Sequence, residues 1–222
     1  MSTAPEERRI VQTVYFASPS EMAAQRHTRA PRWLLWIDSV GGFLVCEGSE
    51  VQIGQAVPGN DVDVPLLADI SRHHASIRRD EEGYLIEAAR EVRVDGRATE
   101  GMTWLGDGST IELGSTVRFQ FRRPHPLSGT ARLDLLSHHR TQPAAAAILL
   151  MADTCVLGPS STCHVTCRNW NAELMLFRRD GKLSCRSEKR FSVDGAGYDQ
   201  VAPIEGAKRI EGDRFCLSIE RI

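Results

Sequence analysis

The sequence predicts an all-β protein made of two tandem β-sandwiches, and three observations support this. Apolar residues recur two positions apart with polar residues between them, as at Val117, Phe119 and Phe121, which is the period of a strand with one buried face. Turn-forming pairs such as Asp95-Gly96 separate these runs, and no apolar stripe of helical period follows residue 32. The third observation, an internal repeat, sets the number of sandwiches.

The repeat has an offset of about 100 residues and preserves the order of its elements. Two pairs of matching segments carry it: Ile77-Arg78-Arg79-Asp80 with Phe177-Arg178-Arg179-Asp180, and Val94-Asp95-Gly96 with Val193-Asp194-Gly195. Because several matches in the same order rarely arise by chance, the chain is predicted to contain two copies of one β unit.

These matches divide the chain into three segments. We expect an N-terminal arm at residues 1–32, a first sandwich at 33–127 and a second, degenerate copy at 128–222. The junction lies near Pro124 and Pro126, because proline interrupts strand pairing. Two interpretations of the arm stay open: a flexible extension, or a segment that pairs with its own sheet or with a partner.

Composition excludes several classes of protein. The 222 residues carry 27 basic and 29 acidic side chains, a net charge of −2 that argues against a nucleic-acid partner. No apolar run approaches the roughly 18–20 residues of a membrane span, and the N-terminus does not look like a secretory signal. The six cysteines form no paired framework, which favours a reduced, cytoplasmic setting, and the arginine-rich composition is typical of a bacterium.

Motifs for catalysis and metal binding are absent from the sequence. It contains no nucleophile elbow, no phosphate-cradling Gly-Lys-Ser/Thr loop and no HExxH pair. Cys163 and Cys167 have no second pair that would complete a zinc site. We therefore expect no enzymatic activity, no metal and no other cofactor.

One set of motifs in the first copy is distinctive. In order it contains Val51-Gln52-Ile53-Gly54, Asn60 to Val64, Ser71-Arg72-His73-His74, Val94-Asp95-Gly96 and a late Leu105-x-x-Gly108-x-x-Ile111-x-Leu113-Gly114 strand. Over roughly residues 33–122 this set resembles a forkhead-associated (FHA) domain. The resemblance implies a β-sandwich whose loops at one end bind phosphothreonine peptides, and for the whole chain it implies two tandem FHA-like β-sandwiches.

The resemblance assigns roles to residues of these loops. A phosphothreonine carries nearly two negative charges and needs fixed hydrogen-bond donors and positive charge. Ser71 supplies a hydroxyl and Arg72 a guanidinium, although Arg72 paired with Asp69 in an ordinary turn is the alternative. His74 is expected to brace the loop, and Gly54 and Gly96 are expected to shape the backbone.

Other positions depart from the family pattern. Gln55 stands where the family usually has an arginine that contacts phosphate, so a donor remains but the charge is lost. Asp95 stands where the family has an asparagine. Arg90 is our candidate replacement for the missing guanidinium, and we group Gln55, Arg90 and Asp95 with Ser71 and Arg72 as peptide-binding residues.

The second copy is expected to bind no phosphate. Gly158 is followed by Pro159, which has neither a side-chain donor nor an N–H group. Ser161 and His164 repeat the Ser-x-x-His letters, but they lie too soon after Gly158 and are predicted to lie near the strand that matches Asn60 to Val64, so the match is coincidental.

Two functional hypotheses remain. The first is a phosphothreonine reader in serine/threonine-kinase signalling, with the chain itself a candidate kinase substrate. The second is a pseudo-FHA scaffold or assembly protein that binds partners independently of phosphorylation. Neither involves nucleic acid or membrane, and the exposed strand edges and the arm permit a homodimer.

Overall fold

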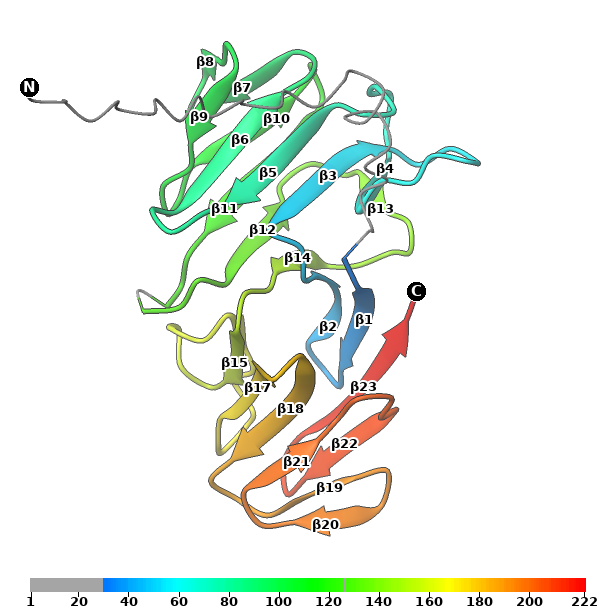
Figure 1. The fold of residues 1–222 in the computed structure, drawn as a ribbon, viewed down its shortest axis with the longest axis vertical. Coiled ribbons are helices and arrows are strands. Elements are labelled where there is room, and N and C mark those ends of the chain that lie inside the picture. The colour runs from blue at the N-terminus through cyan, green and yellow to red at the C-terminus, as the bar shows by residue number, and fades with distance from the viewer. Residues whose placement is uncertain (1–29, 126) are drawn as a thin grey trace, which may run out of the picture.

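The computed structural model describes residues 30–125 and 127–222, and every regular element among them is a β-strand (Figure 1). The prediction of an all-β protein is therefore confirmed. The predicted arm lies outside the described residues except for its last three positions. The described residues contain no helix that could span a membrane.

One long sheet extends through the whole molecule, and its order is β20-β19-β22-β23-β1-β2-β14-β12-β11-β10-β7-β8. In chain order its strands are β1 (Arg32–Ile37), β2 (Gly41–Cys46), β7 (Val92–Val94), β8 (Arg97–Ala98), β10 (Thr110–Leu113), β11 (Val117–Arg122), β12 (Ala131–Leu135), β14 (Ala147–Leu150), β19 (Phe191–Val193), β20 (Ala196–Tyr198), β22 (Arg209–Gly212) and β23 (Cys216–Arg221).

Two shorter sheets pack against the long one. The first has the order β13-β4-β3-β5-β6-β9 and consists of β3 (Glu50–Gln55), β4 (Val64–Leu67), β5 (Ala75–Arg79), β6 (Tyr84–Ala88), β9 (Met102–Trp104) and β13 (Arg140–Thr141). The second has the order β16-β15-β17-β18-β21 and consists of β15 (Thr154–Gly158), β16 (Val165–Thr166), β17 (Leu174–Arg179), β18 (Lys182–Ser187) and β21 (Val201–Pro203).

The strand order is the same in the two halves of the chain. Strands β3 to β11, which we call the first unit, follow the same sheet order as strands β15 to β23, the second unit. The turns at Asp95 and Asp194 also match, because both residues have positive φ angles, 52° and 47°, and are followed by a glycine of positive φ. The sequence repeat thus coincides with a repeat of topology. We propose that the boundary between the two copies lies at residue 127 and that the second is a degenerate FHA-like copy.

The hairpins that precede the two units are exchanged between them. The β1–β2 hairpin precedes the first unit in the chain, but β1 pairs with β23, the last strand of the second unit. The β12–β14 hairpin precedes the second unit, but β12 pairs with β11, the last strand of the first. We had expected two sandwiches that follow one another along the chain; in space, each is completed by the other's hairpin.

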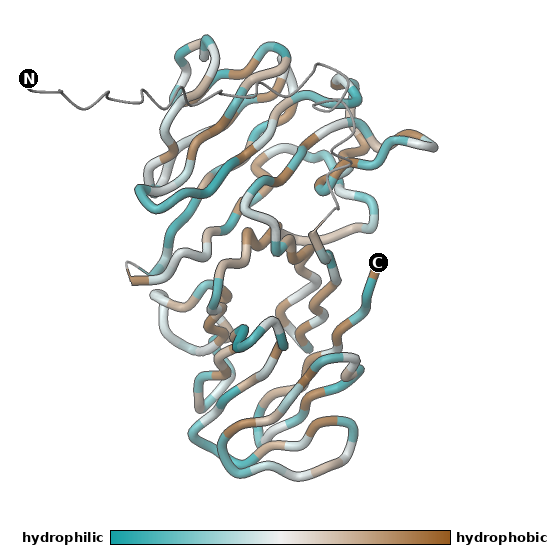
Figure 2. The backbone as a smooth tube through the Cα atoms, in the orientation of Figure 1, coloured by the Kyte–Doolittle hydropathy of each residue, from teal (hydrophilic) through white to brown (hydrophobic). Residues whose placement is uncertain are grey.

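The exchanged hairpins meet where β2 and β14 pair in parallel, and strands β1, β2 and β14 are largely buried on both faces. Along β1, Leu34 belongs to the core of the first unit and its neighbour Leu35 to the core of the second. In β14, Ile148 and Leu149 divide in the same way. Figure 2 shows that hydrophobic residues predominate where these strands cross the middle of the molecule. A strand covered on both faces needs apolar residues at every position, which explains the uninterrupted Ala147–Leu150 run.

A buried carboxylate joins a hairpin to the second unit. Glu47, which follows β2, accepts a hydrogen bond of 2.8 Å from the indole of Trp33 and forms an ion pair with Arg178 of β17. The matching Arg78-Arg79 and Arg178-Arg179 pairs lie on the interior strands β5 and β17, and Arg78 forms ion pairs with Glu50 and Glu87 of the neighbouring strands.

The four tryptophans differ in burial. Trp33 and Trp170 are buried in the core, whereas Trp36 and Trp104 are 41% and 50% exposed. Trp36 lies across Gly42 of the paired strand β2, where a Cβ would come within 2.3 Å of the ring. The outward-facing ring thus covers a glycine instead of filling a core.

The double burial of β1 predicts that adjacent residues are equally important for stability. Leu34→Ala and Leu35→Ala should each lower the free energy of unfolding by about 2–5 kcal/mol, because each leaves a cavity in a different core. Chemical denaturation followed by circular dichroism would measure both effects. Leu67→Ala, at a position that is 53% exposed, serves as the control and should cost less than about 1 kcal/mol. A mild effect of either Leu34→Ala or Leu35→Ala would contradict the shared-strand arrangement.

Candidate functional site

The loop that connects β4 to β5 contains Ser71 and Arg72 and is attached to strand β3 by its backbone. The Gln55 amide donates to the Ser71 carbonyl over 3.1 Å, and the His74 amide donates to the Ile53 carbonyl over 2.9 Å. The loop therefore continues the pairing between β3 and β5, and the backbone on either side of Arg72 is fixed.

Gly54 makes this close attachment sterically feasible. A Cβ atom on Gly54 would lie 1.6 Å from the Arg72 carbonyl oxygen, far inside van der Waals contact. Its backbone has no unusual φ angle, so the glycine is required by the close approach of the loop alone. The expected structural role of Gly54 thus has a defined steric cause.

Asn60, in the loop between β3 and β4, is a support that the sequence reasoning missed as a site residue. Its side-chain amide donates to the Gln55 carbonyl over 2.7 Å and to the Arg72 carbonyl over 2.8 Å. One side chain therefore holds the end of β3 and the Ser71 loop together. In the sequence, this role was indicated only by the position of Asn60, a side chain with two donor hydrogens, in the Asn60 to Val64 segment of the FHA-like motif set.

His74 is 4% exposed and connects three segments. Its Nδ1 accepts a 3.3 Å hydrogen bond from the Ser71 amide, so Nε2 carries the proton and donates to the Glu91 carbonyl over 2.8 Å. The His74 carbonyl accepts from the amides of Ala89 and Arg90, both over 3.1 Å. These hydrogen bonds hold the Ser71 loop against the neighbouring segments, which is the bracing role that we predict for this histidine.

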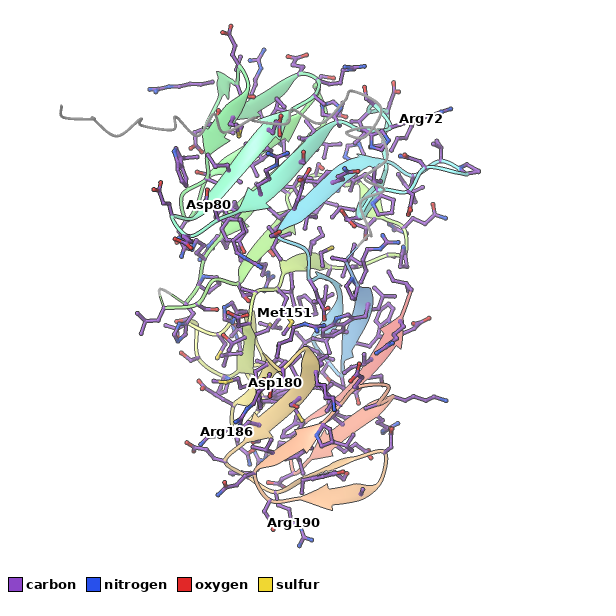
Figure 3. The ribbon with its side chains drawn as sticks, in the orientation of Figure 1. Arg72, Asp80, Met151, Asp180, Arg186 and Arg190 are labelled. Carbon is purple, nitrogen blue, oxygen red and sulfur yellow. The ribbon has the colours of Figure 1, made fainter. Side chains whose placement is uncertain are left out.

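The side chains at this corner remain available for a ligand. Ser71 is half-buried and Arg72 is exposed, and neither side chain has a hydrogen-bond or ion-pair partner within the described residues. The alternative pairing of Arg72 with Asp69 is therefore not formed. The exposed guanidinium of Arg90 donates to the neighbouring Ala89 carbonyl over 2.8 Å and has no carboxylate partner in the described residues. Figure 3 labels Arg72 at the outer end of the first unit.

Asp95 and Gly96 lie elsewhere. They form the turn between β7 and β8, where the Asp95 carboxylate accepts from the Thr110 amide over 2.8 Å and from the Ser109 hydroxyl over 3.2 Å. The turn lies at the Thr110 end of β10, whereas Gly114, beyond the opposite end, approaches His74. The structure thus brings Gln55, Ser71, Arg72 and Arg90 together but not Asp95, whose carboxylate holds its own turn.

The corresponding corner of the second unit has different chemistry. Pro159 follows Gly158, and a groove of about 450 Å³ is lined there by Glu173, Met175, Arg186 and Glu188 among others. Ser161 and His164 lie near β16, the counterpart of β4, as the sequence predicted. Burial and the neighbouring His125 lower the pKa of His164 to about 4, so this histidine is neutral at pH 7 and offers a phosphate no charge.

Comparison with known proteins agrees with this geometry. Residues 51–114 match the family model described as FHA domain. This segment is an FHA domain. It includes the β3 end, the Ser71 loop and the His74 brace of the first unit, which we therefore call the FHA unit. No curated protein matches the chain.

Solved structures of FHA domains are similar to parts of this chain. The FHA-2 domain of an ABC transporter from Mycobacterium tuberculosis is 19% identical, with 62% of this chain and 96% of that chain covered and a TM-score of 0.33. The FHA domain of an Arabidopsis thaliana hypothetical protein is 24% identical, with 39% and 80% covered and a TM-score of 0.29.

The contact at Gly54 predicts a sharp response to one added methyl group. Gly54→Ala should destabilise the protein by at least about 2 kcal/mol, because the Arg72 carbonyl must move to accept it. Gly106→Ala is the matched control: there the nearest atom to an added Cβ is 3.8 Å away and the backbone is unstrained, so the change should be nearly neutral. Thermal unfolding of both variants would compare them, and equal melting temperatures would show that the loop is not held against β3.

Proposed function

We propose that the FHA unit of this chain binds phosphothreonine in partner proteins through Ser71, Arg72 and the loops around them. FHA domains are phosphothreonine-binding interaction modules. The main support for the proposal is that this loop combines a fixed backbone with side chains that are available to a ligand. Its backbone is fixed by Gly54, Asn60 and His74, while the side chains of Ser71 and Arg72 have no partner among the described residues.

The available groups can bind a phosphate because they are hydrogen-bond donors and because their backbone is held in place. The Ser71 hydroxyl and the Arg72 guanidinium are donors, and the guanidinium can bond two phosphate oxygens at once. Because their backbone is already ordered, binding a peptide costs little additional loop entropy. The Arg90 amide is hydrogen-bonded to the His74 carbonyl, and we expect its guanidinium to turn toward a bound phosphate at the corner that Gln55 leaves without charge.

A second function is favoured by one observation, the neutral Gln55. Replacing a charged donor by a neutral one weakens a hydrogen bond by roughly 1 kcal/mol or more, which is close to tenfold in affinity. If Arg90 does not supply the missing charge, the chain is a pseudo-FHA scaffold or assembly protein whose partners bind without phosphorylation. The second unit, with acidic residues at the corresponding corner, fits such an assembly role.

The setting of this function is also a proposal. A reader of phosphothreonine acts with a serine/threonine kinase, in the cytoplasm, on a phosphorylated protein partner, and it needs no cofactor or catalytic residue. The chain itself is a candidate substrate for that kinase. The same proposal includes a homodimer formed through exposed strand edges or through the arm at residues 1–32.

Matched peptides test the proposal. We expect a phosphothreonine peptide selected from a degenerate library to bind the full chain at least tenfold more tightly than its unphosphorylated form, measured by isothermal titration calorimetry. Ser71→Ala and Arg72→Ala should each reduce that affinity by about tenfold, because each removes a donor to the phosphate. Arg90→Ala should have an effect of similar size.

The control is Asp95→Asn, which keeps an acceptor in the β7–β8 turn and should leave peptide affinity unchanged. Equal affinity for the two peptide forms would overturn the phosphate-dependent function and favour the scaffold. Full affinity in Arg90→Ala would remove Arg90 from the site while leaving the rest of the proposal intact.

A further inference from the structure

The connection within the second hairpin is much longer than that within the first. Residues 38–40 join β1 to β2 directly, whereas residues 136–146 join β12 to β14 and contain the additional strand β13. Strand β13 has no counterpart in the second unit, and it forms the edge of the FHA unit's shorter sheet, beside β4 (Figure 1). Because the hairpins are exchanged, this segment from beyond the repeat junction lies on the FHA unit.

The register places this segment beside β4, the strand that leads into the Ser71 loop. Arg140 pairs with Leu67 and Thr141 with Leu66 in antiparallel orientation. In that orientation, the residues that precede Arg140 continue past Leu67 in the direction in which β4 leads to Asp69 and Ser71. The loop before β13 therefore runs beside the segment that leads from Leu67 to Ser71.

The same loop is fixed at its other end. The Leu136 amide donates to the Arg118 carbonyl over 2.8 Å, and the Arg118 amide donates to the Ser137 hydroxyl over 3.2 Å. A ring nitrogen of His139 lies 2.9 Å from the same hydroxyl. Hydrogen bonds from β11 and β4 thus position residues 136–140, which we call the flanking loop, on both sides.

The flanking loop exposes positive charge beside an apolar side chain. Arg140 is exposed and has no hydrogen-bond or ion-pair partner within the described residues, although Asp69 follows the neighbouring strand. His138 is also exposed. Leu67, directly across from Arg140, is 53% exposed, whereas Thr141 faces inward and is 1% exposed. Arg140 and Leu67 therefore form a mixed basic and apolar surface on the outer face of the sheet.

We propose that the flanking loop is a second contact surface for the peptide bound at Ser71 and Arg72, and that Arg140 binds an acidic side chain of that peptide. This proposal rests on the proposed function. Thr141, Leu66, Gln55 and Ser71 lie on four adjacent backbone segments, so Ser71 is about three strand spacings, roughly 14 Å, from β13. An extended peptide covers this distance in about four residues, which brings a residue three to five positions from its phosphothreonine to Arg140. The second repeat thus contributes to specificity without a phosphate site of its own.

The test uses three phosphothreonine peptides and the full chain. One peptide has glutamates three to five positions before the phosphothreonine, one has them three to five positions after it, and one has alanines in both places. We expect wild-type protein to bind one glutamate peptide about three- to tenfold more tightly than the alanine peptide. Arg140→Ala should abolish that preference and leave the alanine peptide unaffected, while Arg140→Lys should retain most of the preference.

Arg97→Ala is the matched control, because Arg97 is an exposed arginine on β8, next to the Asp95 turn. It should leave the preference intact. Equal binding of all three phosphopeptides, or a preference that survives Arg140→Ala, would overturn the role of the flanking loop while leaving the proposed function standing. Failure of every phosphopeptide to bind more tightly than its unphosphorylated form would instead overturn the proposed function and this inference with it.

Discussion

Three adjacent strands, β1, β2 and β14, are buried on both faces, and the rest of the structure depends on this constraint. Each strand contributes alternate residues to two cores, so neither unit has a complete core without the hairpin that the chain places before the other. A doubly covered strand gains roughly twice the apolar burial of a surface strand. The partly buried ion pair of Glu47 with Arg178 holds the first hairpin to the second unit at the same junction.

The exchange of hairpins also determines what surrounds the candidate site. At the start of β1, the Arg32 guanidinium donates to the carbonyls of Val62 and Asp63 over 3.1 and 2.7 Å, in the segment just beyond the Asn60 support. The second hairpin brings Arg140 beside β4. Both hairpins thus contact the loops of the FHA unit, and a peptide bound there would touch residues from distant parts of the chain. The two repeats are alike in topology, but their corresponding corners differ in the side chains they present.

Much of this arrangement could be predicted from the sequence, and the exceptions have physical causes. Alternating apolar residues and paired turns at Asp95 and Asp194 predicted the strands and the repeat, because these signals are local. The exchange could not be predicted, because β11 and β23, the last strands of the two units, have equivalent edges and β1 could pair with either of them. Within the site, the brace by His74 followed from the motif. The support by Asn60 and the use of the Asp95 carboxylate in its own turn depend on distances that appear only in three dimensions.

The central claim is that one corner of this double sandwich binds phosphothreonine and the equivalent corner of the other unit does not. Titration of the isotope-labelled full chain with a phosphothreonine peptide, followed by backbone amide chemical shifts, tests it most directly. The account predicts shifts that saturate together at residues 54–60, 71–74 and 89–91, with none at residues 159–173. Shifts of similar size at residues 159–173, or identical shifts with the unphosphorylated peptide, would contradict it.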